Sequence, residues 1–205
     1  MNAHRHEIII QAFDHFRTYG FKNVTMDDLA LNIGISKKTL YELFKDKDEL
    51  VLESVKYMLQ NNQEKTEQAF AHSKNAVEQI IQILQLMESM MRGMNMVCYM
   101  DLQKYYPSAF KYLSNHKQEF LYACISNNLK QGVSEGLFRE DIDIEIISKF
   151  RLESALIVFQ NNIFPQDQYD IVKVNAQIFA NYMYGIASLK GHKLITQYIN
   201  EINKK

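Results

Sequence analysis

The chain has little of what breaks a helix or crosslinks a fold. Its 205 residues include two prolines, seven glycines and two cysteines, and no tryptophan. An all-β fold needs many turns, and turns use proline and glycine, so the scarcity of both argues against that class. Cys98 and Cys124 form no C-x-x-C pair and indicate neither a disulfide framework nor a zinc knuckle. Because long stretches with helical apolar spacing remain, the sequence predicts an all-α protein.

The chain also lacks an excess of either charge and any long apolar run. Lys and Arg number 23 and Asp and Glu 24, for a net charge of −1, so a nucleic-acid surface would have to be a local patch. No run approaches the roughly 18 consecutive apolar residues of a membrane span. The N-terminus has no signal-peptide pattern. We therefore expect a soluble, cytoplasmic protein with no membrane partner.

Motifs of common catalytic and cofactor sites are missing as well. The sequence contains no G-x-G-x-x-G, no P-loop and no nucleophile elbow, and its six histidines show neither H-x-x-x-H nor H-E-x-x-H spacing. We therefore expect no cofactor, no metal site and no enzyme. Cys98 could be a redox sensor or a buried, inert thiol, and the lack of a cationic neighbour that would lower its pKa favours the second reading.

What is present begins with two short helices that have strong caps. Thr25 and Ser36 are good N-caps, and Gly20 and Gly34 are good left-handed stops. Two short helices joined by a one-glycine corner at Gly34 describe a helix-turn-helix. We therefore expect residues 1–50 to form a three-helix DNA-binding domain and residues 51–205 to form a larger helical domain.

In a helix-turn-helix the N-terminal residues of the second helix lie on the base edges of the major groove. The side chains there that do not build the core are of types that contact DNA, and Lys47 and the Thr25 cap can reach the backbone. The predicted contact residues on this helix are Lys37, Lys38, Thr39 and Tyr41. The alternative is a solvated, lysine-bearing helix in an ordinary bundle, because residues 1–50 hold seven basic and eight acidic residues.

The segment TMDDLALNIGISKKTLYELFKDKDEL resembles the DNA-binding domain of TetR-type (TetR/AcrR family) transcriptional regulators. Its residues meet the signature T-x-x-x-I/L-A-x-x-x-G-V/I-S-x-x-x-L-Y-x-x-F-x-x-K-x-x-L without a gap. The resemblance implies that Thr25, Ser36, Tyr41 and Lys47 hold phosphates and that Lys37, Lys38 and Thr39 face bases or phosphates. Two positions depart from the family's usual residues. Lys38 stands where many members have a small residue, often glycine or alanine, and Leu43 stands where an aromatic residue or histidine is frequent.

The resemblance further implies a homodimer that binds a pseudo-palindromic double-stranded DNA operator and releases it when a small effector binds the larger domain. Family members pack their last two long helices, here about 143–163 and 168–190, against a partner. The residues predicted for this interface are Phe150, Ser154, Ile157, Phe179, Tyr182, Met183 and Ile186. The alternative is that most of them are intramolecular core.

An effector pocket is expected near the segment QLMESMMRGMNMVCYM, because methionine adapts to irregular partners. The candidate pocket residues are Met87, Met90, Met91, Met94, Tyr99 and Tyr122. Gap-filling core is the other reading of these methionines. The low charge of this region suggests an apolar or weakly polar effector. For the whole chain, the alternative to a ligand-responsive repressor is a helical binding module or small enzyme that does not bind DNA.

Overall fold

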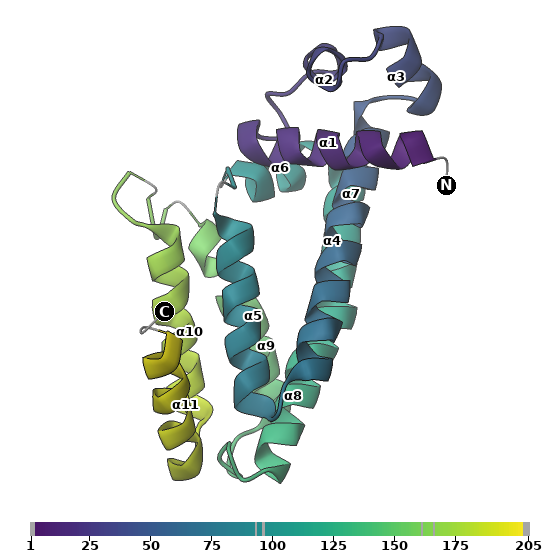
Figure 1. Cartoon of the computed structure of the whole chain (residues 1–205). Coiled ribbons are helices and arrows are strands. Elements are labelled where there is room, and N and C mark those ends of the chain that lie inside the picture. Colours follow the sequence, from purple (N-terminus) through teal and green to yellow (C-terminus); the bar gives the residue numbers. More distant parts are fainter. Residues whose placement is uncertain (1–2, 93, 96, 161, 166, 203–205) are drawn as a thin grey trace. The chain divides into compact units, whose positions relative to one another are not determined.

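The computed structural model describes residues 3–202 except 93, 96, 161 and 166, and this part of the chain is helical with no β-strand (Figure 1). The α-helices are α1 (Ala3–Tyr19), α2 (Met26–Ile33), α3 (Lys37–Leu43), α4 (Lys47–His72), α5 (Ala76–Met91), α6 (Val97–Tyr105), α7 (Pro107–His116), α8 (Tyr122–Ser134), α9 (Ile144–Ser154), α10 (Ile171–Ile186) and α11 (Leu189–Ile202). A π-helical turn (Lys117–Leu121) joins α7 to α8, and a short 3₁₀ helix (Ile157–Phe159) follows α9. The predicted all-α class is confirmed.

The chain divides into two compact units, and neither is continuous in sequence. Residues 1–63 and 93–116 make unit 1, and residues 64–92 and 117–205 make unit 2. Each unit has a hydrophobic core of its own. Residue 50, where the sequence predicts a domain boundary, lies inside α4, and that boundary stays a prediction.

The core of unit 1 joins the first helices to α6 and α7. Phe16, Leu29, Leu40 and Phe44 are almost completely buried in it, and Leu102 of α6 packs into the same cluster. Because α2 and α3 have only eight and seven residues, neither would be stable alone, and this shared core holds them in place.

Hydrogen bonds tie α6, and the residue between α6 and α7, to the loop that follows α1. The Tyr106 hydroxyl donates to the carbonyl of Phe21 at 3.0 Å, and Asp101 accepts from the backbone N–H of Lys22 at 2.9 Å. Unit 1 is therefore a helix-turn-helix backed by two helices from far along the chain.

In unit 2, helices α5, α8, α10 and α11 enclose the second core, with Leu129, Phe138, Phe179 and Ile195 among its most buried residues. Helix α9 packs on α8. The helix predicted for residues 143–163 ends at Ser154 instead. There the Ser154 hydroxyl donates to the carbonyl of Arg151 at 3.0 Å, a local bond that competes with the helix's own hydrogen-bond ladder.

Candidate nucleic-acid interface

The corner between α2 and α3 is built by local hydrogen bonds that the sequence predicts. The Thr25 hydroxyl accepts from the backbone N–H of Asp28 at 3.1 Å, and Asp28 in turn accepts from the backbone N–H of Thr25 at 2.9 Å. Gly34 then adopts φ 78°, a left-handed conformation that favours glycine, and ends α2. The Ser36 hydroxyl caps α3 by accepting from the N–H of Thr39 at 3.0 Å. These caps and stops are confirmed, and they fix where α3 begins.

Helix α3 divides its side chains as the DNA-binding reading requires. Leu40 is fully buried, whereas the side chains of Lys37 and Lys38 are 62% and 88% exposed and Tyr41 is 51% exposed. Thr39 is half-buried, and its hydroxyl lies 2.8 Å from that of Ser36. The outer side of α3 therefore presents two lysines and a tyrosine to solvent.

The two lysines of α3 have acidic partners in the free protein. The Lys37 ammonium donates to the carboxylate of Asp27 on α2. The Lys38 ammonium lies 3.9 Å from the carboxylate of Glu42, one turn further along α3. All four side chains are more than half exposed, and pairs of this kind contribute only about 0–1 kcal/mol each. A phosphate can replace either carboxylate as the lysine's partner at small cost.

Lys47, a predicted phosphate contact, is half-buried and faces unit 1 itself. Its ammonium donates to the carbonyl of Lys22 at 3.2 Å and lies 5.5 Å from the ring centroid of Tyr106. Burial lowers the pKa of this amine, an effect that the carboxylates of Asp101, Asp48 and Asp28 oppose. Lys47 would have to leave these contacts to reach DNA.

Thr25 and Ser36 are exposed but already bonded. The Thr25 hydroxyl donates to the carboxylate of Asp28 at 2.7 Å, and this bond, with one from the Thr25 backbone, lowers the pKa of Asp28. Both hydroxyls therefore serve as helix caps in the free protein, and their predicted role as phosphate ligands stays a prediction.

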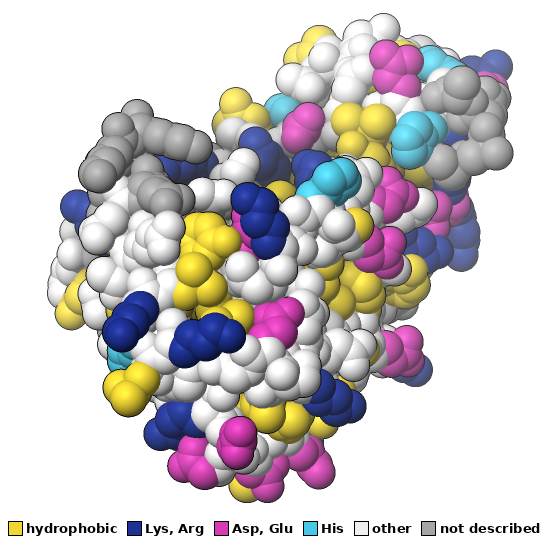
Figure 2. Space-filling model, turned by 60° about the horizontal axis from the view of Figure 1, so that its bottom comes forward, with side chains coloured by type: hydrophobic (Ala, Val, Ile, Leu, Met, Phe, Trp, Pro, Cys, Tyr) yellow, Lys and Arg dark blue, Asp and Glu magenta, His cyan; other side chains and the backbone are white. Residues whose placement is uncertain are grey.

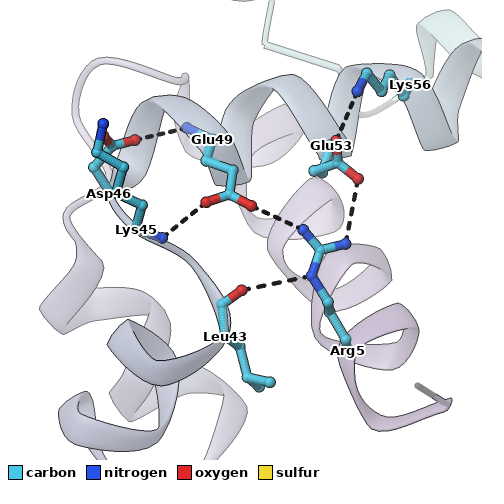
Figure 3. A network of polar contacts seen from close by, with 7 residues as sticks. All are labelled: Arg5, Leu43, Lys45, Asp46, Glu49, Glu53 and Lys56. Atoms are coloured by element: carbon cyan, nitrogen blue, oxygen red, sulfur yellow. Dashed lines mark hydrogen bonds and ion pairs between the residues drawn. The ribbon is translucent and has the colours of Figure 1, made fainter. Parts of the chain in front are cut away.

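A polar network that no sequence pattern indicates surrounds Arg5 and joins α1, α3 and α4 (Figure 3). The Arg5 guanidinium donates to Glu49 at 3.0 Å, to Glu53 at 3.3 Å and to the carbonyl of Leu43 at the end of α3 at 3.5 Å. Glu49 also accepts from the backbone N–H of Lys45 at 2.8 Å. The network holds the C-terminal end of α3 against α1 and α4, and so fixes the direction in which α3 points.

The predicted pocket residues are divided between the two units. Met87, Met90, Met91 and Tyr122 belong to unit 2, whereas Met94 and Tyr99 belong to unit 1. Met91 is buried, Met90 is 36% exposed and Met87 packs against the core of unit 2. Met96, in the same segment, lies outside the described residues.

A hollow of about 450 Å³ lies within unit 2, between the end of α4 and α5. Its lining residues are Lys65, Gln68, Ala69, His72, Gln82, Gln85, Leu86 and Ser89. None of the predicted pocket residues is among them, so the assignment of those residues to an effector site stays a prediction.

The residues predicted for a partner contact fall into two sets. Phe179, Tyr182, Met183 and Ile186 of α10 are at most 7% exposed, because they pack in the core of unit 2 within the chain itself. These four residues therefore pack as intramolecular core, which is the alternative to the predicted partner contact.

The other set lies outside that core. Phe150 of α9 is 58% exposed, and Ser154 and Ile157 are half-buried. An apolar groove of about 310 Å³ runs between α9 and α10, lined by Ile147, Phe150, Ile178, Asn181, Tyr182, Gly185 and Ile186. Phe150 is therefore an exposed apolar side chain at the edge of this groove.

Elsewhere on the molecule, the described residues form no extended surface of a single charge on the face drawn in Figure 2. On the face drawn in Figure 2, basic and acidic side chains are interspersed. Cys98 is buried, and burial raises the pKa of its thiol to about 12, as expected of an inert cysteine. Within the described residues, no cluster of His, Cys, Asp or Glu is arranged to hold a metal ion, and no helix has the length and apolarity to cross a membrane.

Two capped helices that meet at a left-handed glycine, with lysines and a tyrosine exposed on the second, define a helix-turn-helix DNA-binding protein. Residues 8–54 match the family model described as bacterial regulatory proteins, tetR family. Residues 8–54 therefore form a TetR-type DNA-binding domain, and the chain is similar to TetR-type transcriptional regulators.

Relatives of known sequence and structure agree with this assignment. The HTH-type transcriptional repressor KstR2 of Mycobacterium tuberculosis is 25% identical over 163 residues, which cover 73% of this chain and 76% of the relative. A putative transcriptional regulator from Saccharomonospora viridis, solved in complex with choline, superposes with a TM-score of 0.76 at 14% identity, over 92% of this chain and 100% of that one. FadR from Bacillus subtilis, solved in complex with stearoyl-CoA, gives a TM-score of 0.65 at 16% identity, over 88% and 98% of the two chains. At these identities the two solved structures establish the fold alone.

Proposed function

We propose that this chain is a ligand-responsive repressor that acts in the cytoplasm as a homodimer on a pseudo-palindromic operator. The observation that carries the proposal is the exposure of Lys37, Lys38 and Tyr41 on a helix whose opposite side, at Leu40, is fully buried. Such a helix can enter the major groove without disturbing the core behind it.

The first turn of α3 would supply most of the DNA contacts. Lys37 and Lys38 would neutralise phosphates or donate to guanine, and Tyr41 would donate to a phosphate. Releasing the counterions of those phosphates makes binding strongly dependent on salt. The Arg5 network supports this role, because a recognition helix held at its far end loses less conformational freedom when it binds.

The dimer would form through the exposed apolar surface of α9 and α10. Ile146 and Phe150, one helical turn apart on α9, are 63% and 58% exposed and form one apolar strip on its surface. Gly185 lies inside α10, where glycine costs about 1 kcal/mol relative to alanine. Among the described residues, no atom beyond its chain neighbours and its own helix backbone lies within 4 Å of where its Cβ would be. A partner's side chain seated over Gly185 would account for a glycine there. A two-fold dimer would match two half-sites about 34–36 Å apart.

An effector would bind in unit 2 and favour a state of the dimer that no longer fits the operator. Two proteins of similar fold were solved with small molecules, choline in one and stearoyl-CoA in the other. The effector needs only to prefer the non-binding state, and a coupling of about 1–3 kcal/mol between the sites would suffice.

The test is fluorescence anisotropy with labelled DNA from upstream of the chain's own gene, titrated at several salt concentrations. Lys37→Ala and Lys38→Ala should weaken binding and flatten the salt dependence by about one unit for each phosphate that the variant no longer neutralises. Lys193→Ala is the matched control, because Lys193 is an exposed lysine on α11 in unit 2. Its salt dependence should equal that of the wild type.

Unchanged salt slopes in both α3 variants would count against α3 as the DNA-binding element. Absent or salt-insensitive binding by the wild type would favour the alternative of a helical binding module that does not bind DNA.

A further inference from the structure

Arg151 is a buried cation in the middle of unit 2. It lies on α9, is 5% exposed, and its guanidinium carbon is 4.3 Å from the ring centroid of Phe179 and 5.4 Å from that of Tyr182 on α10. Its Nη2 donates to the sulfur of Met87 on α5 at 3.7 Å. The guanidinium is thus enclosed by two aromatic rings and a thioether.

Within the described residues, Arg151 lacks the partner that a buried charge needs. No carboxylate there forms an ion pair with it, and its buried Nη1 has no hydrogen-bond acceptor. Burial lowers the pKa of the guanidinium to about 10, so that it remains protonated at neutral pH. Buried charges in proteins are ordinarily paired, because an unpaired one destabilises the fold strongly.

Two further buried polar side chains, one on α9 and one on α10, also lack hydrogen-bond partners among the described residues. Ser148 precedes Arg151 by three residues on α9, and its buried hydroxyl has no partner among the described residues. Asn175 precedes Phe179 by four on α10, is 1% exposed, and neither its amide nitrogen nor its oxygen is bonded there. Residues three and four apart share one face of a helix. Folded proteins leave few such groups unsatisfied, so their concentration on these two faces indicates a site.

We propose that Arg151 recognises the negative charge of the effector, and that the effector is an organic carboxylate with an apolar chain. This inference rests on the proposed function, because it identifies the class of ligand to which the repressor responds. A guanidinium and a carboxylate are both planar and form paired, charge-assisted hydrogen bonds.

The surroundings of Arg151 fit both ends of such a molecule. The rings of Phe179 and Tyr182 both lie on α10 with their centroids 6.4 Å apart, so they contact the guanidinium from adjacent sides and leave its buried Nη1 free to donate to a carboxylate. Met87 and Phe179 offer apolar contact to the chain, and methionine adapts to ligands of different shape. Ser148, one turn from Arg151 on α9, and Asn175, one turn from Phe179 on α10, have unbonded polar atoms. The sequence predicts an apolar or weakly polar effector, and this inference specifies it as an apolar molecule that carries one carboxylate.

The experiment uses the purified full-length chain and a panel of straight-chain carboxylates (hexanoate, octanoate and decanoate), each paired with the alcohol of the same chain length. Thermal unfolding is followed at increasing ligand concentration for the wild type, Arg151→Met, Arg151→Lys and Lys149→Met. Lys149 is an exposed lysine on the same helix, paired with Glu145, and serves as the control. Operator binding of the wild type is measured in parallel, without ligand and with each carboxylate.

At least one carboxylate should raise the unfolding temperature of the wild type and of Lys149→Met, and release wild-type DNA, while its alcohol does neither. Arg151→Met should bind that carboxylate at least tenfold more weakly, and Arg151→Lys should lie in between. Without ligand, Arg151→Met should unfold at the wild-type temperature or above, because it removes an unpaired buried charge. A structural arginine would instead give a lower unfolding temperature and an unchanged carboxylate response, which would overturn the proposal.

Equal shifts from carboxylates and alcohols, or no shift from any carboxylate, would also overturn it. The proposed function is judged separately, by whether the wild type binds operator DNA when no ligand is present.

Discussion

Replacing Asp27 with asparagine should tighten operator binding, because the Asp27 carboxylate holds the ammonium of Lys37 in the free protein. Asparagine keeps the size of the side chain but removes the charge. Lys37 then has no competing partner, and the surface that faces the DNA phosphates carries one negative charge fewer in each protomer. The variant therefore measures how much the Lys37–Asp27 ion pair of the free protein weakens the contact of Lys37 with DNA.

The size of the effect follows from the exposure of the pair. The side chains of Lys37 and Asp27 are 62% and 58% exposed, and exposed pairs contribute about 0.2–1 kcal/mol. In the proposed dimer, two protomers double this to about 0.4–2 kcal/mol, which corresponds to an affinity gain of about twofold to thirtyfold. Glu42→Gln should give a smaller gain, because the Lys38–Glu42 separation is longer, at 3.9 Å.

The assay is the same anisotropy titration at one fixed salt concentration, with Asp27→Asn tested alone and together with Lys37→Ala. The gain should largely disappear in the Lys37→Ala background. A gain of the same size in both backgrounds would refute the pairing argument, since the effect would then come from net charge alone. Asp27 lies in the first turn of α2, where an acid contributes about 0.3–1 kcal/mol through the helix dipole, so the unfolding temperature of each variant is measured as well.

Two further predictions concern assembly and acid stability. Phe150→Asp should convert the proposed dimer to a monomer in sedimentation velocity and weaken operator binding. Leu189→Asp alters an 87% exposed residue on α11 and should leave the dimer intact. A dimeric Phe150→Asp variant would exclude the α9–α10 surface as the interface. Burial raises the pKa of Glu53, but hydrogen bonds from Lys56 and Arg5 outweigh it and bring that pKa below its usual 4.5. The stabilisation by Glu53 is therefore complete above pH 4.5 and is lost as pH falls through the lower folded pKa. The difference in unfolding temperature between wild type and Arg5→Met should accordingly shrink below pH 4.5, and a constant difference across pH would contradict this assignment.

Local signals made the corner of the helix-turn-helix predictable. Thr25, Gly34 and Ser36 act on backbone groups within a few residues of themselves, so their roles can be read from spacing alone. The buried side of α3 was likewise predictable, because Leu40 and Phe44 follow helical periodicity.

Contacts between distant parts of the chain were not predictable in this way. Arg5 meets Leu43 and Glu53 across 38 and 48 residues, and Lys47 turns toward Lys22 across 25. Periodicity also identified the apolar side of α10 without telling what covers it. Phe179 proved to be covered by its own chain, because spacing along one helix contains no information about the partner helix.

The discontinuous path of the chain through unit 1 has a consequence for its synthesis. The segment from α6 to α7 contributes Cys98, Leu102, Tyr106 and Ala109 to the core that supports α3, so a fragment that ends at residue 63 lacks four of its buried side chains. On the ribosome, the packing of the N-terminal helices can be completed only after residues 98–109 have emerged. A nascent regulator would thus acquire its affinity for a promoter only once this second segment of unit 1 has been made.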